Sequence, residues 1–305
     1  MVSYQGIISL VQTDLAVLDQ MLDKLLKENQ NDLTFKLEKY LFSKSKRIRS
    51  VLIFLLARAI SGVVSDSEYK VSTATELVHN ASLIHDDIID DADIRRGEMT
   101  INNQFNNELA VVAGDFLLSL ALDELLLINN PKVVKIFVNS LRSLCEGEIS
   151  QYFSKNKVLT IEEYLSKSEK KTAMLFKAAL LGVDALNKSL NTEKISEFAL
   201  NFGLAFQVRD DLLNVLSLDQ TKPLYSDIKN GIYTAPVIYY LDENKPDVVD
   251  LETFLKNLEN STAIAKTREL IQKHVDLAIA SLDFLEDNLY KEAIIELCEY
   301  LSEVD

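Results

Sequence analysis

Apolar residues recur at three- and four-residue spacing along almost the whole chain, and this spacing is typical of one face of an α-helix. Near the N-terminus the stripe consists of Leu15, Leu18, Leu22, Leu25 and Leu26. The same pattern predicts further helices over residues 48–60, 68–92, 105–129, 131–153, 161–181, 192–216, 233–242, 251–259, 262–287 and 289–302. Residues 95–97 are expected to form a loop or a helix end, and 218–231 a polar connection between helices.

The composition supports an all-α protein. The 305 residues include only eight Gly and four Pro, and 48% of the residues are hydrophobic. So few helix-breaking residues argue against an architecture of strands and turns. No repeat, low-complexity tract or long linker divides the chain. We therefore expect a single domain over residues 1–305, a large helical bundle around a central cavity.

Charge and hydropathy exclude several classes of protein. A net charge of −15 argues against nucleic-acid binding. No run of about 18 uncharged apolar residues is present, so no membrane span is expected. Asp14, Asp19 and Asp23 interrupt the apolar positions that a signal peptide would need. Cys145 and Cys298 are expected to be reduced thiols of a cytoplasmic protein.

Two short acidic clusters lie in apolar helical surroundings, more than a hundred residues apart. The first is Asp86-Asp87-Ile88-Ile89-Asp90 and the second is Asp210-Asp211-Leu212-Leu213-Asn214. Burying several carboxylates is costly unless cations neutralise them. A solvated acidic helix face is the alternative, but such a face does not need apolar flanks. We therefore expect the clusters to face one another across a cavity and to share metal ions.

The spacing within the clusters favours magnesium. Residues four apart lie on one face of a helix, so Asp86 and Asp90 project together, as do Asp210 and Asn214. Ligands that offer only oxygen suit Mg²⁺. Zinc would favour His or Cys, and the chain has only three His and two Cys.

Basic residues accompany the acidic clusters. Each one alone is compatible with an ordinary surface charge. Together, carboxylates for magnesium and Lys or Arg for phosphate indicate a diphosphate site, and the apolar helices suggest that the rest of the ligand is hydrocarbon. The basic residues concerned are Lys46, Arg47 and Arg49, then Arg95 and Arg96, then Lys171, and finally Lys222 and Lys229.

These motifs resemble those of the trans-isoprenyl diphosphate synthases, and in particular the medium- and long-chain polyprenyl synthases. Residues 82–90 (SLIHDDIID) followed by Arg95-Arg96-Gly97 resemble the first aspartate-rich motif of that family, and residues 206–211 (FQVRDD) the second. Supporting matches occur in the family's order and cover most of the chain. They are Lys46-Arg47-x-Arg49, Gly114-Asp115-Phe116, Glu146-Gly147-Glu148 with Gln151, Lys171-Thr172, and Asp227-Ile228-Lys229 with Gly231.

The resemblance implies an isoprenoid synthase fold of class I. It also implies head-to-tail condensation, in trans, of an allylic diphosphate with isopentenyl diphosphate. Three Mg²⁺ ions would be held by Asp86, Asp90 and Asp210. They would neutralise the leaving diphosphate and so lower the barrier to ionisation.

Further roles follow from the same resemblance. Arg95, Lys171 and Lys222 would bind the allylic diphosphate, with Lys229 as a further phosphate contact. The diphosphate of the second substrate would be held by Lys46, Arg49, His79 and Arg96. Thr172 and Gln207 are polar and weakly nucleophilic, so they suit a place beside the allylic cation. The released diphosphate would remove the final proton, so no separate general base is needed.

Product length in this family depends on residues just before the first cluster, which are often bulky aromatics in short-product enzymes. Here they are Ala81 and Ser82, and both are small. We therefore expect a product longer than geranylgeranyl diphosphate. The alternative is ordinary helix packing, in which small residues permit close approach of two helices.

The chain departs from the family pattern at a few positions. Lys44-Ser45 stands where Gly-Gly is usual, and Ser50 stands where Pro is common. Asn214 replaces the last Asp of the second cluster, and Ile232 occupies a position that is often Lys in the family. These departures leave open a catalytic subunit of a heteromer, although homodimers are usual in the family. The lipid product would provide the enzyme's contact with membranes.

Three other functions fit the sequence less well. A class I terpene cyclase would share the first motif, but the basic residues at 46–49 and the second Asp pair argue against it. A non-catalytic partner subunit would be expected to have lost motif residues that this chain retains. A purely structural bundle leaves the paired clusters unexplained.

Overall fold

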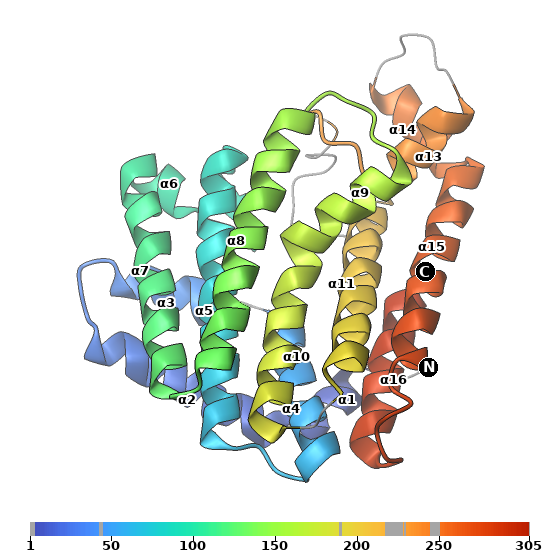
Figure 1. The fold of residues 1–305 in the computed structure, drawn as a ribbon. Helices are drawn as coiled ribbons and strands as arrows, with labels where there is room; N and C mark the ends of the chain where they lie inside the picture. The colour runs from blue at the N-terminus through green and yellow to red at the C-terminus, as the bar shows by residue number, and fades with distance from the viewer. Residues whose placement is uncertain are drawn as a thin grey trace. The chain divides into compact units, whose positions relative to one another are not determined.

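The protein is described here by a computed structural model, in which helices joined by short connections make up nearly all of the described chain (Figure 1). The structure describes residues 4–42, 45–188, 191–216, 228, 230–244 and 251–304. Its only strands within these ranges are β1 (Ile94–Arg95) and β2 (Glu98–Met99), which pair as a small antiparallel hairpin. The expectation of an all-α protein is confirmed.

The helices follow the chain in a simple order. They are α1 (Tyr4–Leu10), α2 (Gln12–Glu28), α3 (Thr34–Phe42), α4 (Ile48–Ser61), α5 (Asp66–Ile89), α6 (Ile101–Gln104), α7 (Asn107–Leu127), α8 (Pro131–Ser154), α9 (Ile161–Ser168), the π-helical turn η1 (Glu169–Ala173), α10 (Met174–Asn187), α11 (Thr192–Val215), α13 (Ala235–Glu243), α14 (Leu251–Glu259), α15 (Thr262–Ala280) and α16 (Leu289–Ser302).

All the helices predicted from apolar spacing are present, with differences at their ends. The helix expected over 68–92 ends at Ile89, because Asp91 adopts a positive φ of 51° and turns the chain toward the hairpin. The helix expected over 161–181 extends to Asn187 but contains the π-turn η1. Three short helices, α1, α3 and α6, and the hairpin were not predicted. Most of the connection expected over 218–231 lies outside the described residues.

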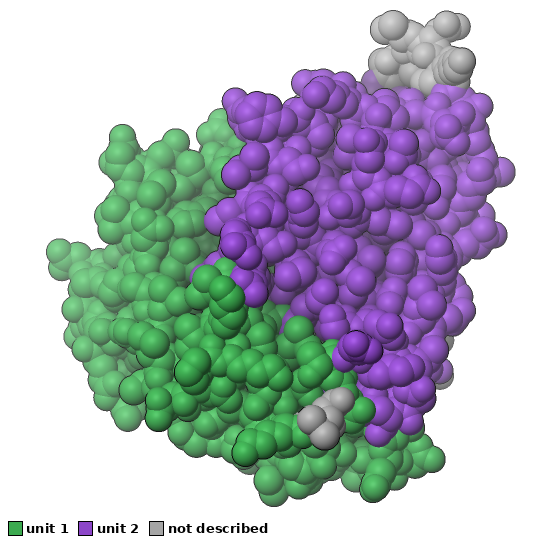
Figure 2. Space-filling model, viewed as in Figure 1, with its two compact units in different colours: residues 1–138, 178–192, 285–296 green, residues 139–177, 193–284, 297–305 purple. Residues whose placement is uncertain are grey.

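The described chain divides into two compact units, coloured separately in Figure 2. Unit 1 comprises residues 1–138, 178–192 and 285–296, and contains the first acidic cluster. Unit 2 comprises residues 139–177, 193–284 and 297–305, and contains the second. That the chain is one domain, and that the clusters face one another across a cavity, remain predictions.

The core of unit 1 is built around α5. The Ser65 side chain accepts from the Glu68 amide and the Glu68 carboxylate accepts from the Ser65 amide, so a capping box starts the helix. Helix α5 then packs against α2, α4 and, most extensively, α7. Gly114 of α7 lies so close to the His85 ring of α5 that any Cβ would collide with it. The acidic cluster is therefore carried on a helix held from several sides.

Unit 2 holds α11 at its centre by close helix contacts. A Cβ added at Gly203 of α11 would lie 2.6 Å from Cα of Ala173 in η1. The aromatic rings of Phe176 and Phe202 meet edge to face, with centroids 5.3 Å apart. Helix α13 packs against both α15 and α9. These contacts fix the segment that carries the second acidic cluster.

Two expectations about the chain as a whole can be compared with the structure. No described helix combines the length and the apolar composition needed to cross a bilayer. Cys145 and Cys298 are both free thiols, Cys145 exposed and Cys298 buried, as expected.

Candidate active site

The first acidic cluster occupies the last turn of α5, and its three carboxylates have different surroundings. Asp86 and Asp90 are both partly exposed, and Asp90 forms the C-cap of the helix. Asp87 is fully buried and accepts hydrogen bonds from Nε of Arg95 at 2.5 Å and from the Tyr40 hydroxyl at 2.9 Å. Burial raises the pKa of Asp87, and the charge of the adjacent Asp86 adds to this, against the opposing effect of Arg95.

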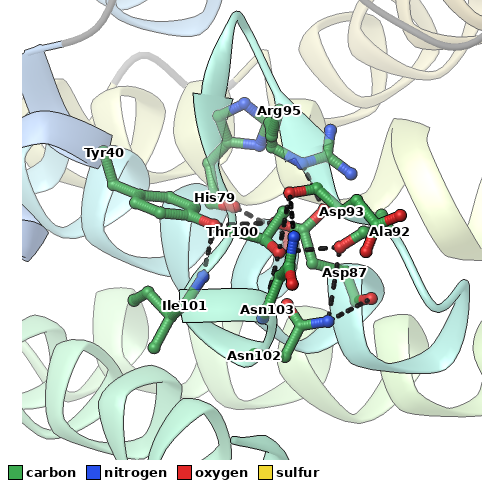
Figure 3. A network of polar contacts seen from close by, with 11 residues as sticks. Tyr40, His79, Asp87, Ala92, Asp93, Arg95, Thr100, Ile101, Asn102 and Asn103 are labelled. Atoms are coloured by element: carbon green, nitrogen blue, oxygen red, sulfur yellow. Dashed lines mark hydrogen bonds and ion pairs between the residues drawn. The ribbon is translucent and has the colours of Figure 1, made fainter. Parts of the chain in front are cut away.

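The segment after the cluster is tied down by a polar network, shown in Figure 3. The Thr100 hydroxyl donates to the carbonyl of Ala92 at 2.7 Å, and the Asn103 amide donates to that of Asp93 at 3.2 Å. The Asn102 amide donates to the carbonyls of both Asp87 and Ala92, at 3.4 and 3.3 Å. The turn that carries Arg95 is thus fixed relative to the acidic cluster.

Four arginines act electrostatically on His79, which lies on α5 two helical turns before Asp86. Burial, followed by the charges of Arg49, Arg96, Arg95 and Arg47, lowers the pKa of His79 well below its ordinary value near 6.5. The imidazole is therefore neutral at pH 7. A concentration of guanidinium groups around a neutral donor is suited to a phosphate or diphosphate. Arg49 and Arg96 are thus among the charges that act on His79, and the shared substrate-binding role that the resemblance implies for the three residues remains a prediction.

Sequence reasoning gave no role to Glu76, and it named Arg47 only as a member of the basic motif, without a ligand of its own. Glu76 is only 2% exposed, accepts from the Ser50 hydroxyl at 2.6 Å and pairs with Nη1 of Arg47 at 3.5 Å. Arg47 also pairs through Nη2 with Asp19 at 2.8 Å. A buried Glu one turn before His79, on an otherwise apolar helix face, was the available signal. Ser50, noted as a departure from the family pattern, is thus part of this network.

The second acidic cluster lies near the end of α11. Asp210 is partly exposed, whereas Asp211 and Asn214 are buried. Asp211 accepts from the Tyr164 hydroxyl at 2.6 Å and from the Gln207 amide at 2.8 Å. The second Asp of each cluster is therefore bound by a tyrosine, Tyr40 in unit 1 and Tyr164 in unit 2. Nothing in the sequence pointed to either tyrosine.

Three predicted site residues meet beside the second cluster. The Thr172 hydroxyl donates to Oε1 of Gln207 at 2.5 Å, and the Lys171 ammonium pairs with Glu148 at 2.6 Å. Lys171 and Thr172 lie in the π-turn η1, a distortion often found at functional sites. Gly147 makes room for it, because a Cβ there would lie 2.9 Å from the Lys171 amide nitrogen.

The remaining predicted residues are placed as follows. Ala81 is fully buried on α5, and the Ser82 hydroxyl donates to the His79 carbonyl at 2.8 Å. The backbone carbonyl of Lys46 accepts from the Tyr4 hydroxyl at 2.5 Å. Lys222 and Lys229 lie outside the described residues. The roles given to all these side chains remain predictions.

The carboxylates suit a hard cation by their chemistry. Asp86 and Asp90 lie one turn apart on α5 and are both partly exposed, while Asp87 is already used within the protein. Such an oxygen donor pair fits magnesium, which keeps several waters when bound to proteins. Within the described ranges, no three His, Cys, Asp or Glu side chains form a group able to hold a metal ion. The ligand set of Asp86, Asp90 and Asp210 therefore remains a prediction.

Comparison with known proteins gives consistent matches. The family described as Polyprenyl synthetase matches residues 31–274. A prenyl transferase of Cyanidium caldarium is 34% identical over 94% of this chain and 94% of its own. A decaprenyl-diphosphate synthase of Dictyostelium discoideum is 35% identical over 85% of this chain and 59% of its own. The crystal structure of a polyprenyl synthase from Caulobacter crescentus, complexed with calcium and isoprenyl diphosphate, aligns with a TM-score of 0.89 and 25% identity over 99% of this chain and 98% of that one.

These matches extend over most of the chain and agree in fold and in kind of activity. They confirm the expectations of a class I isoprenoid synthase fold and of a trans-prenyltransferase related to medium- and long-chain synthases. The chain belongs to the polyprenyl synthetase family.

Proposed function

We propose that this enzyme condenses an allylic diphosphate with isopentenyl diphosphate, head-to-tail and in trans, to a polyprenyl diphosphate longer than geranylgeranyl diphosphate. The observation that carries the proposal is the grouping of four arginines about a neutral His79, on the same helix as Asp86 and Asp90. An anion site and a carboxylate pair within one unit are what a diphosphate substrate and its metal ions require. The relative named decaprenyl-diphosphate synthase supports a long product.

Magnesium is the proposed cofactor, with three ions per active site and Asp86, Asp90 and Asp210 as the protein ligands. When bound, magnesium would supply positive charge to the departing diphosphate and so favour its release. The calcium and isoprenyl diphosphate in the Caulobacter crescentus structure support a need for divalent metal. The surroundings of the two clusters also support a need for divalent metal. Tyrosine hydroxyls donate hydrogen bonds to Asp87 and Asp211, whereas the first Asp of each pair is partly exposed.

Binding of isopentenyl diphosphate is assigned to Lys46, Arg49, His79 and Arg96. The neutral imidazole of His79 can donate a hydrogen bond without adding to the repulsion among the guanidinium groups. Arg49 and Arg96 supply planar donor sets that match phosphate oxygens. The second substrate is thereby held with its hydrocarbon end free to react.

The allylic diphosphate is assigned to Arg95, Lys171 and Lys222, with Lys229 as an additional contact. The ion pair of Arg95 with Asp87 fixes the direction of its guanidinium and leaves further N–H donors for phosphate. Lys171 is held by Glu148 in the π-turn. Preorganised charge of this kind assists ionisation because it need not rearrange during the reaction.

The allylic cation formed by ionisation needs nearby dipoles and no strong nucleophile. Thr172 and Gln207 fit this need, since their hydrogen bond fixes two neutral oxygens beside the second cluster. The Gln207 amide is also bound by Asp211, which sets its orientation. The departing diphosphate then accepts the proton that leaves when the new double bond forms.

The length of the product is assigned to α5 before the first cluster. Ala81 and Ser82 are small, and they leave more room along the helix than aromatic side chains would. We further propose that the enzyme acts in the cytoplasm as a homodimer, with a heterodimer as the alternative, and meets membranes through its lipid product. The resemblance to the family supports this assembly.

A direct assay tests the proposed reaction. The purified chain is incubated with farnesyl diphosphate, isopentenyl diphosphate and magnesium, and product length is read by mass spectrometry. Successive five-carbon additions beyond twenty carbons are expected, and none should form when EDTA replaces magnesium. A terpene cyclase would consume the allylic substrate but not isopentenyl diphosphate. Failure to incorporate isopentenyl diphosphate would refute the proposal.

A further inference from the structure

Arg209 stands beside the second acidic cluster and has no part in the proposed catalytic machinery. It directly precedes Asp210 on α11 and is only 7% exposed. Within the described part of the chain no carboxylate pairs with its guanidinium, and its Nε lacks a hydrogen-bond partner. A buried guanidinium is costly unless other groups compensate its lost hydration, so the groups that surround Arg209 must supply this compensation.

The compensating groups belong to the C-terminal part of α16 and the residues directly after it, within unit 2. The Cζ atom of Arg209 lies 4.8 Å from the centroid of the Tyr300 ring, which is close enough for a cation–π interaction. Nη2 of Arg209 donates to the carbonyl of Glu303 at 3.5 Å, a long hydrogen bond. Leu301 and Val304 are buried, so the backbone on both sides of Glu303 is anchored. The ring stack is therefore the main contact of this guanidinium.

A second tyrosine of α16 also stacks on an arginine, and the comparison shows what is particular to Arg209. The Cζ atom of Arg58 lies 5.7 Å from the centroid of the Tyr290 ring. Arg58 already donates to both carboxylate oxygens of Asp14, at 2.8 and 2.9 Å. The ring is thus an addition to an ion pair there, whereas Arg209 has the Tyr300 ring in place of a carboxylate.

We propose that Arg209 and Tyr300 are positioning residues, which hold α11 in the orientation that Asp210 needs as a metal ligand. The inference rests on the proposed function, because that function makes Asp210 a ligand. Neighbouring residues of a helix project about 100° apart, so Asp210 can face a metal ion while Arg209 is held in the stack. Holding Arg209 limits rotation of α11 about its axis, and with it the direction of the Asp210 carboxylate. Magnesium demands near-ideal octahedral geometry, so a misdirected carboxylate binds it less tightly.

The test follows the melting temperature of the full-length protein as Mg²⁺ is added, at a fixed concentration of farnesyl thiodiphosphate. This unreactive analogue of the allylic substrate binds together with the metal, so the rise in melting temperature reports metal binding without turnover. Tyr300→Leu removes the ring and should move the midpoint of the rise to about tenfold higher Mg²⁺, the loss typical when a group that orients a metal ligand is removed. Tyr300→Phe keeps the ring and should move the midpoint less than about twofold.

Tyr290→Leu is the matched control, because it removes the other stacked tyrosine of α16 and should move the midpoint less than about twofold. Equal midpoints for Tyr300→Leu and Tyr290→Leu would overturn the proposal, and so would a Tyr300→Phe midpoint that matches that of Tyr300→Leu. The melting temperature without Mg²⁺ shows whether each variant folds. If Tyr300→Leu does not fold, Arg209→Lys takes its place, because it keeps the charge but loses the planar stack. An unchanged midpoint in Arg209→Lys also refutes the proposal.

Asp210→Asn separates this inference from the proposed function. A shifted midpoint in Asp210→Asn with an unchanged one in Tyr300→Leu would refute the positioning role alone. An unchanged midpoint in Asp210→Asn would remove Asp210 from the metal site, and the positioning role with it. Incorporation of labelled isopentenyl diphosphate gives a second readout, because the Tyr300→Leu enzyme should recover most of its kcat at saturating Mg²⁺. A kcat that stays low at every Mg²⁺ concentration would indicate general structural damage and overturn the proposal.

Discussion

Arg95 donates from Nε to Oδ1 of Asp87 at 2.5 Å and so joins the hairpin to the last turn of α5. The carboxylate of Asp87 is buried by this contact and by the Tyr40 hydroxyl, while its neighbour Asp86 remains partly exposed. Two adjacent aspartates of one motif thus have different tasks. One stabilises the turn that carries the arginines, and the other is the proposed metal ligand.

The different surroundings of Asp86 and Asp87 predict that similar substitutions affect different properties, activity at Asp86 and stability at Asp87. Asp86→Asn should lower kcat by about two orders of magnitude or more without loss of stability, because it removes a proposed metal ligand. Asp87→Asn should lower the free energy of unfolding by about 2 kcal/mol, because the buried carboxylate that binds the partly buried Arg95 guanidinium loses its charge. Urea unfolding and incorporation of labelled isopentenyl diphosphate measure the two effects. A stable, fully active Asp86→Asn enzyme would remove Asp86 from the metal site.

Burial should decide how much each of two carboxylates that bind the Arg47 guanidinium contributes to the free energy of unfolding. Glu76→Gln should destabilise the protein by about 2 kcal/mol, because Glu76 is buried against Arg47 and also accepts from Ser50. Asp19→Asn should cost less than about 1 kcal/mol, although its distance to Arg47 is shorter, because Asp19 is half exposed to water. Urea unfolding of both variants at pH 7 gives the comparison. The prediction fails if Asp19→Asn proves the more damaging change.

The close packing of α11 against the π-turn η1 should require a glycine at position 203. Gly203→Ala would bring a Cβ within 2.6 Å of Cα of Ala173, so a loss of about 1–3 kcal/mol in stability is expected. Activity should fall as well, since η1 carries Lys171 and Thr172. The matched control is Gly6→Ala on α1, where nothing lies within 4 Å and a gain of up to about 1 kcal/mol is expected. Equal melting temperatures for the two variants would contradict this account.

Product length should respond in a graded way to bulk on α5. Ala81→Phe should shorten the polyprenyl chain, and Ala74→Phe, two helical turns earlier, should shorten it less. Both alanines are fully buried, so thermal melts must first show that each variant folds. Mass spectrometry of the products provides the readout. An unchanged chain length in a folded Ala81→Phe enzyme would place the end of the hydrocarbon tunnel elsewhere.

A buried histidine in unit 2 should make stability depend on pH. His274 is buried and contacts Oδ1 of Asn201 through Nδ1 at 2.9 Å, and burial lowers its pKa to about 4. In the unfolded chain the imidazole takes up a proton near pH 6.5, so the folded state loses stability as pH falls below that value. The loss from His274 should reach about 2 kcal/mol at pH 5.

Comparison with His274→Gln isolates this contribution, because His79 still titrates in that variant. Urea unfolding at pH 7 and pH 5 should show a smaller drop in stability for His274→Gln than for the unchanged protein. Parallel drops would mean that the imidazole of His274 is solvated in the folded state.

The sequence determined the helices and the chemistry of their charged residues. Apolar spacing is a local property, so it located the long helices such as α5 and α11 within a few residues. The order of the motifs was enough to indicate the family, since each motif is a short run of adjacent residues. The hairpin and the shortest helices were missed because they contain too few residues to show a period.

Only the tertiary structure decided which side chains of each motif are used within the protein and which remain partly exposed. Tyr40 meets Asp87 and Tyr164 meets Asp211 across 47 residues in each case, a separation that no local pattern records. The same holds for Glu76 beside Arg47, and for Arg209 beside Tyr300. Periodicity tells which face of a helix is buried, but the partner of a buried charge is fixed by packing between segments distant in the sequence.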